Sequence, residues 1–157
     1  YYPQIASTYY QPTQPQTNVA YESGRVQRGT SPLMTLTFKT GTISLADVAE
    51  QTLAAEERLT TYINALRTIS EVDPTVPVYA TIEHEAEVKL NNDEYESVIP
   101  TLQQIAAATN RFIQRCRAEA PLVKTVYWYG GADTAKINTI LSGLSASHPP
   151  HVICMDR

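Results

Sequence analysis

Acidic residues and one histidine gather in the segment IEHEAEV, the densest group of ionisable side chains in the chain. Apolar and polar residues alternate over residues 76–90, which predicts a strand with one wet face. On that strand Glu83, Glu85 and Glu87 would lie about 6.6 Å apart in succession, too far for two of them to share a metal unaided. His84 would point to the opposite, apolar side. We therefore interpret the cluster as a solvated acidic face with a core histidine, and we predict neither catalytic residues nor a metal site.

A glycine turn in VYWYGGADTAK is the second candidate, because a predicted strand ends there and a helix begins. Backbone N–H groups at such a junction can hold a phosphate. The sequence lacks both G-x-G-x-x-G and the GK[ST] ending of a phosphate-binding loop, and Asp133 at the helix cap would repel an anion. A simple chain turn is the first interpretation. The alternative is a small-ligand or nucleotide-binding site at Gly130, Gly131 and Asp133, and no cofactor is predicted.

Tyrosines form a third candidate surface. Tyr79, Tyr127 and Tyr129 are expected on the polar side of the sheet, where aromatic rings can stack RNA bases or form a protein interface. The acidic strand beside them, the net charge of −4 and the lack of a basic run argue against nucleic acid. We predict a protein interface made by these residues and by four N-terminal tyrosines: Tyr1, Tyr2, Tyr9 and Tyr10.

The remaining histidines and cysteines give weaker signals. His148 and His151 flank two prolines and would need a further ligand, such as Asp156, to hold a metal. We interpret them as part of a loop. Cys116 and Cys154 are too few for a disulfide scaffold and are expected to be buried free thiols, with a single bridge between them as the alternative in an oxidising compartment.

Four strands and three helices are expected to position these residues. Ser44 and Asp47 resemble a capping box, which opens a long amphipathic helix, and Asp133 caps a short one. The expected order is a strand from Met34 to Lys39, a helix over 44–69, a strand over 76–90, a helix from Ile99 to Cys116, a strand from Leu122 to Tyr129, the short helix, and a last strand in HVICM.

These elements predict an α/β (α+β) fold, a two-layer sandwich in which two long helices and one short helix cover a mixed four-stranded sheet. The alternation along residues 76–90 favours a mixed sheet, because strands buried on both faces lose it. A doubly wound, three-layer fold is the alternative, but it would bury the three glutamates of that strand.

The first thirty residues differ in composition from the rest. They contain Pro3, Pro12 and Pro15, no charge before Glu22, and no hydrophobic periodicity. We predict an extended arm rich in Tyr, Gln, Pro and Thr over residues 1–30, followed by a two-layer body over residues 31–157.

The combination favours a non-enzymatic structural or interaction subunit that assembles through the arm and the tyrosine face, as in a virion, filament or complex. Its expected partner is protein, as a homo-oligomer or larger assembly, with no nucleic acid bound through the body. The small-ligand domain is the alternative, and an enzyme built on His84 with Glu85, or on Asp133 with His151, ranks last. Neither a membrane-spanning segment nor a signal peptide is expected from the sequence.

Overall fold

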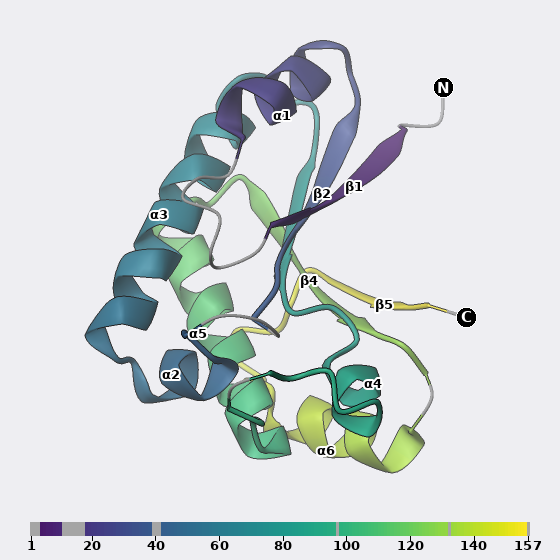
Figure 1. Cartoon of the computed structure of the whole chain (residues 1–157). Coiled ribbons are helices and arrows are strands. Elements are labelled where there is room, and N and C mark those ends of the chain that lie inside the picture. The colour runs from purple at the N-terminus through teal and green to yellow at the C-terminus, as the bar shows by residue number, and fades with distance from the viewer. Residues whose placement is uncertain (1–3, 11–17, 39–41, 97, 132, 157) are drawn as a thin grey trace.

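A computed structural model describes residues 4–10, 18–38, 42–96, 98–131 and 133–156, which contain five strands and six helices. Figure 1 shows their arrangement. In chain order they are β1 (Ile5–Tyr10), α1 (Val19–Gln27), β2 (Ser31–Leu36), α2 (Leu45–Glu50), α3 (Leu53–Ser70), β3 (Val78–Ile82), α4 (Ala86–Asn91), α5 (Leu102–Glu119), β4 (Val123–Tyr129), α6 (Thr134–Gly143) and β5 (Val152–Met155).

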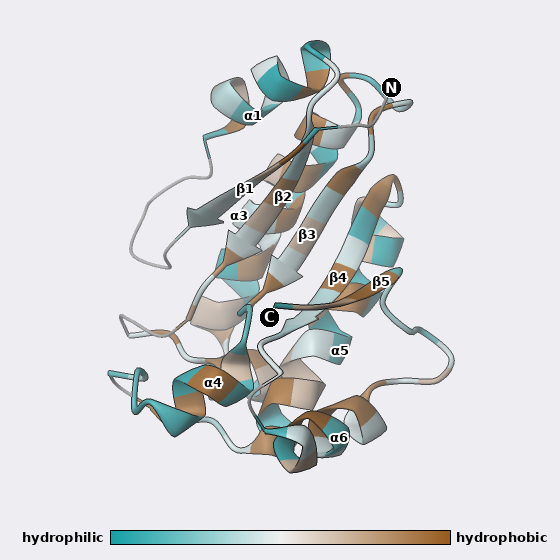
Figure 2. Ribbon diagram, turned by 90° about the vertical axis from the view of Figure 1, so that its right-hand side faces the viewer, coloured by the Kyte–Doolittle hydropathy of each residue, from teal (hydrophilic) through white to brown (hydrophobic). Residues whose placement is uncertain are grey.

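All five strands are parallel, and their order across the sheet is their order in the chain. Because parallel crossovers are right-handed, strands added in sequence keep returning their helices to the same face. Figure 2 shows α3 and α5 behind the sheet, and the opposite face toward the viewer. The α/β class is as predicted, but the mixed four-stranded sheet with three helices is wrong: the sheet has five parallel strands, and six helices accompany it.

The expected strand over residues 76–90 is half strand and half helix. β3 ends at Ile82, and α4 begins at Ala86. Glu83 and Glu85 between them have φ angles of 48° and 52°, in the left-handed region that few non-glycine residues adopt. Apolar and polar residues go on alternating beyond Ile82, through the turn and into α4, so the alternation predicted a strand longer than β3.

The first long helix is interrupted once. Ser44 and Asp47 form the predicted capping box at the start of α2. Gln51 then adopts a left-handed conformation (φ 57°), which ends α2 after six residues and separates it from α3. The second long helix, α5, begins at Leu102 behind a capping box made by Thr101 and Gln104.

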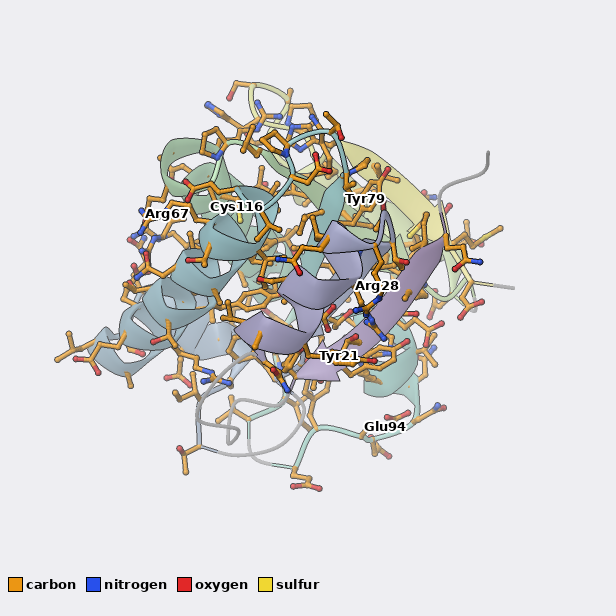
Figure 3. All side chains as sticks on the ribbon, turned by 90° about the horizontal axis from the view of Figure 1, so that it is seen from above. Tyr21, Arg28, Arg67, Tyr79, Glu94 and Cys116 are labelled. Carbon is orange, nitrogen blue, oxygen red and sulfur yellow. The ribbon has the colours of Figure 1, made fainter. Side chains whose placement is uncertain are left out.

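The N-terminal segment contributes to the folded body. Residues 5–10 pair with β2 as a parallel strand, and residues 19–27 are helical where we expected extended chain. The hydroxyl of Tyr10 donates to Glu22 Oε1 at 2.8 Å, which ties β1 to α1 in a buried contact. Figure 3 shows Tyr21 and Arg28 on the outer surface of α1. Ser31, near which we predicted the boundary between arm and body, is the first residue of β2.

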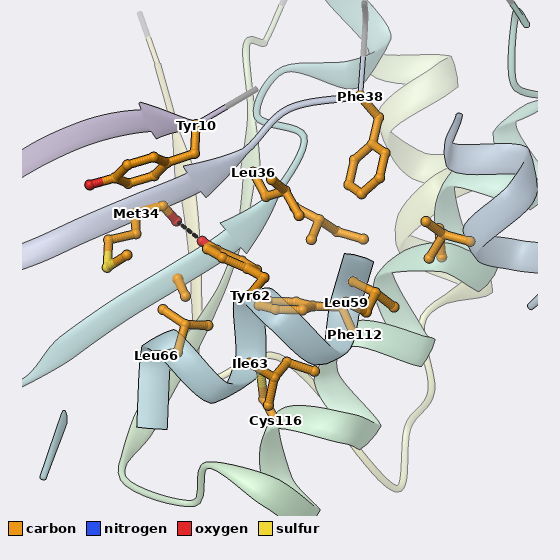
Figure 4. Close-up of a cluster of buried hydrophobic side chains, with 14 of the residues drawn as sticks. Tyr10, Met34, Leu36, Phe38, Leu59, Tyr62, Ile63, Leu66, Phe112 and Cys116 are labelled. Atoms are coloured by element: carbon orange, nitrogen blue, oxygen red, sulfur yellow. Dashed lines mark hydrogen bonds between the residues drawn. The ribbon is translucent and has the colours of Figure 1, made fainter. Parts of the chain in front are cut away.

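The core lies between the sheet and the helices α1, α3 and α5. Tyr62 on α3 is fully buried, stacks on Phe112 of α5 with ring centroids 6.0 Å apart, and donates its hydroxyl to the backbone oxygen of Met34 at 2.9 Å (Figure 4). This hydrogen bond satisfies a phenol that burial would otherwise penalise. Both layers are therefore joined by packing and by a specific polar contact.

Candidate site at the carboxyl ends of the strands

The carboxyl ends of all five strands lie at one end of the sheet, since the strands are parallel. Ligands of parallel α/β sheets bind outside these ends, where loops and helix starts meet. Figures 1 and 2 place α4 and α6 at this end. The residues that follow β3, β4 and β5 are therefore the first to consider.

Three aromatic rings form a row across this end. The ring centroids of Tyr9 and His84 are 4.6 Å apart, and those of His84 and Trp128 are 5.6 Å apart. Tyr10 contacts α1 on the helix side, so alternation directs Tyr9 to the open face. Tyr9 keeps 48% of its surface exposed, and His84 and Trp128 are half-buried. The row therefore offers partly exposed aromatic surface to a ligand.

Two carboxyl groups accompany the aromatic row. Burial raises the pKa of Glu85, and repulsion from the Asp156 carboxylate together with a hydrogen bond between the two side chains raises it further; Lys89 acts in the opposite direction. The pKa of the Tyr9 hydroxyl is also raised, first by burial and then by the charges of Glu85 and Asp156. Burial and the neighbouring Asp156 charge therefore both disfavour ionisation of Glu85.

The glycine turn closes one side of the site. A Cβ added to Gly130 would meet Val88 Cγ2 and lie 3.3 Å from Glu85 Oε1, so the missing side chain lets α4 and Glu85 lie against the end of β4. Gly131 has a φ of 78°, and a Cβ there would lie 3.1 Å from Met155 Sδ. The backbone N–H of Gly130 donates to a carboxylate, Glu87 Oε1, which leaves that N–H engaged within the protein.

Asp133 has the capping role that the sequence indicated. Its side chain accepts from Lys136 N at 3.1 Å at the start of α6, and Lys136 Nζ lies 3.7 Å from its second oxygen. The structure thus brings Gly130 next to Glu85 and Gly131 next to Met155, whereas Asp133 is engaged with the first turn of its own helix. Their predicted role in ligand binding stays a prediction.

Below the site lies a buried ion pair. Glu83 and Lys89 are 2% and 4% exposed, and Lys89 Nζ donates to Glu83 Oε1. Thr37 Oγ1 donates to the same carboxylate oxygen at 2.9 Å, and the backbone N–H of Phe38 donates to the other. The expected solvated acidic face is therefore wrong for Glu83 and Glu87, both of which are buried.

The predicted tyrosine face is divided between two sides of the sheet. Tyr79 pairs in register with Lys124 and shares the open face with it, half-buried. Tyr127 is 2% exposed within the core, and its ring stacks with that of Tyr129 at 6.2 Å. The expectation that these tyrosines share one face is wrong, because β4 presents its even-numbered residues to the open face. Tyr1 and Tyr2 lie outside the described residues.

His151 fastens the start of β5 to β4. The ring Nδ1 of His151 accepts from the backbone N–H of Thr125 at 3.1 Å, and the backbone N–H of His151 donates to Thr125 O at 2.9 Å. Burial, with the charges of Lys124 and Arg117, lowers the pKa of His151 and favours the neutral ring that can accept. The histidine thereby holds in place the strand that leads to Asp156.

Both cysteines are free. Cys116 is buried and Cys154 is half-buried on β5, and burial raises the pKa of each thiol. Among the described residues, no group of three or more His, Cys, Asp or Glu side chains is arranged to hold a metal ion.

No family model matches the sequence, and no curated protein shows significant similarity to it. None of the helices in the described part of the chain is long and apolar enough to span a membrane.

The local sequence patterns do not predict the aromatic row or the Glu85–Asp156 pair as one site. Tyr9 falls in the predicted arm, Trp128 in an ordinary predicted strand, and Glu85 and Asp156 in segments with no predicted contact. A repeated strand-to-helix order would have indicated parallel strands, and with them a common end for His84, Trp128 and Asp156.

Proposed function

We propose that the chain binds a neutral, hydroxyl-rich ligand, of which a saccharide is the chemical class that fits, at the carboxyl ends of the strands. The observation that carries the proposal is the row of Tyr9, His84 and Trp128 beside the Glu85–Asp156 pair. Aromatic faces stack on the apolar faces of sugar rings, and carboxyl groups accept from and donate to sugar hydroxyls.

The charges at the site favour a neutral ligand over an anion. Asp156 and Glu85 would repel a phosphate, and the backbone N–H of Gly130 is already taken by Glu87. Ligand hydroxyls can instead donate to the carboxyl oxygens of Asp156 and Glu85. This proposal keeps the small-ligand alternative of the sequence, but moves its centre from the glycines to the carboxyl pair beside them.

Trp128 makes the proposal directly testable, since it is the only tryptophan of the chain. Titration with neutral oligosaccharides should change the intrinsic tryptophan fluorescence in a saturable way. Tyr9→Ala should weaken binding by about 2 kcal/mol, or about thirtyfold in Kd, the size of an aromatic anchor at a binding site.

Matched variants separate the site from the rest of the surface. Tyr21→Ala removes an exposed tyrosine of α1 and should leave Kd unchanged. Equal losses for the Tyr9 and Tyr21 variants, or no saturable signal from any neutral saccharide, would refute the proposal.

A second candidate function is assembly, which the apolar edge strand β5 favours. Val152, Ile153 and Met155 are 37%, 53% and 42% exposed, and β5 is an outer strand of the described sheet. Unpaired edges with apolar side chains are ready to pair with another chain. We expect a second copy as the partner, and light scattering should show dimers that Ile153→Asp dissociates; a wild-type monomer at all concentrations would exclude it.

A further inference from the structure

The segment from Glu83 to Glu85 connects β3 to α4 and carries two side chains of the proposed site. Two of its residues have left-handed φ angles, 48° at Glu83 and 52° at Glu85. Such conformations are costly for residues with a Cβ and persist only where the surroundings hold them. The contacts that hold this turn therefore decide where His84 and Glu85 point.

Three elements hold the turn. The backbone N–H of Glu83 donates to Leu36 O at 2.9 Å on the β2 side, and that of Glu85 donates to Trp128 O at 2.9 Å on the β4 side. From α4, Lys89 Nζ donates to the backbone oxygen of His84 at 2.6 Å and lies 3.3 Å from His84 Nδ1. The same ammonium pairs with the Glu83 carboxylate, so one cation contacts the turn at three points.

We propose that Lys89 is a positioning residue that, anchored by Glu83, fixes the turn and thereby orients His84 and Glu85 toward the ligand. The inference rests on the proposed function for the identity of the ligand, but not for the geometry of the turn. Lys89 itself is 4% exposed and lies beneath the aromatic row, so it acts through its neighbours.

The positive charge of Lys89 also affects the titration of Glu85, which can be measured separately from the fold. Glu85 faces charged or titratable groups from three sides: Asp156 after β5, Glu87 and Lys89 on α4, and Tyr9 on β1. Lys89 is the cation among them, and it lowers the pKa of Glu85 while Asp156 and Glu87 raise it. Removal of the ammonium should therefore move the Glu85 titration to higher pH.

The test uses the double variant Glu83→Gln/Lys89→Met, because removal of Lys89 alone would strand a buried carboxylate and endanger folding. Carbon-detected NMR of the side-chain carboxyl groups follows the Glu85 titration without any ligand. We expect Glu85 to titrate at higher pH than in wild type, and the binding of the saccharide found in the fluorescence screen to weaken by about tenfold, the lower range for loss of a group that orients binding residues.

Lys89→Arg serves as the matched control. It keeps a cation opposite Glu83, so no buried charge is stranded, and Glu85 should titrate near its wild-type pH. A folded double variant in which Glu85 titrates as in wild type would overturn the inference, whether or not a ligand binds. Failure of the wild-type protein to bind any saccharide would refute only the proposed function, because the NMR titration still decides the role of Lys89.

Discussion

Replacement of Gly130 by alanine tests the close approach of α4 to the end of β4. The added Cβ would meet Val88 Cγ2 at less than contact distance and lie 3.3 Å from Glu85 Oε1. Overpacking of this kind costs about 1–3 kcal/mol of unfolding free energy. Since Glu85 immediately precedes α4, displacement of the helix should also disturb the carboxyl pair.

Gly24→Ala is the matched control for this change. Gly24 lies in the middle of α1, and its nearest neighbour is the flexible guanidinium of Arg28 at 3.3 Å. The added methyl should stabilise the helix by about 0.5–1 kcal/mol. The two glycine variants should therefore change stability in opposite directions in urea denaturation followed by circular dichroism.

Val88→Ala completes a double-mutant cycle on the same contact. Removal of the Val88 methyl groups should recover at least about 0.5 kcal/mol of the loss in Gly130→Ala, a measurable coupling between residues in contact. Strict additivity of the Gly130 and Val88 variants, or a Gly130→Ala protein as stable as wild type, would show that α4 does not lie against Gly130 as described.

Two further variants test the layers that support the site. Glu56→Gln should cost about 1 kcal/mol at pH 7, because hydrogen bonds from Arg111 hold the pKa of Glu56 below its usual range in a partly exposed pair. A depressed folded-state pKa contributes stability above the unfolded pKa, so thermal melts of the two proteins should converge as the pH falls below about 4; a gap that persists there contradicts the pairing. Tyr62→Phe should cost about 1–2 kcal/mol by leaving Met34 O without its buried donor, and should leave ligand affinity unchanged. Loss of binding in a folded Tyr62→Phe protein would mean that core and site are coupled in a way the contacts do not account for.

The elements predicted correctly are those whose periodicity and capping residues all lie within one continuous segment. The helical periodicity of α3 and α5, the caps at Ser44 and Asp133, and the edge strand β5 follow from neighbouring residues alone. In each case propensity, periodicity and capping agree with the packing, so these elements can be predicted from local sequence.

Elements that depend on distant partners were mispredicted. β1 is a partly exposed edge strand that becomes a strand by pairing with β2, and α1 contains Gly24, which weakens its helical signal. Residues 86–91 fit either period, and the left-handed turn at Glu83 and Glu85 that separates β3 from α4 depends on contacts with Leu36, Trp128 and Lys89. The spacing of residues along the sequence does not predict these contacts.

The candidate site depended on the same missing knowledge. Glu85 and Asp156 are far apart in the chain and meet because β3 and β5 are parallel members of one sheet, on either side of β4. The alternation along residues 76–90 favoured a mixed sheet, but a parallel sheet with one open face alternates as well, so the sequence did not bring these residues together.

A single NMR measurement tests most directly whether these residues form one ligand site. Proton–nitrogen correlation spectra of the protein should be recorded while a neutral oligosaccharide is added. We predict that the indole N–H of Trp128 and the backbone amides of His84, Glu85, Gly130 and Asp156 shift together with one dissociation constant. Shifts confined to other parts of the surface, such as Asn110 and Gln114 on α5, or no shifts at any accessible concentration, would contradict it.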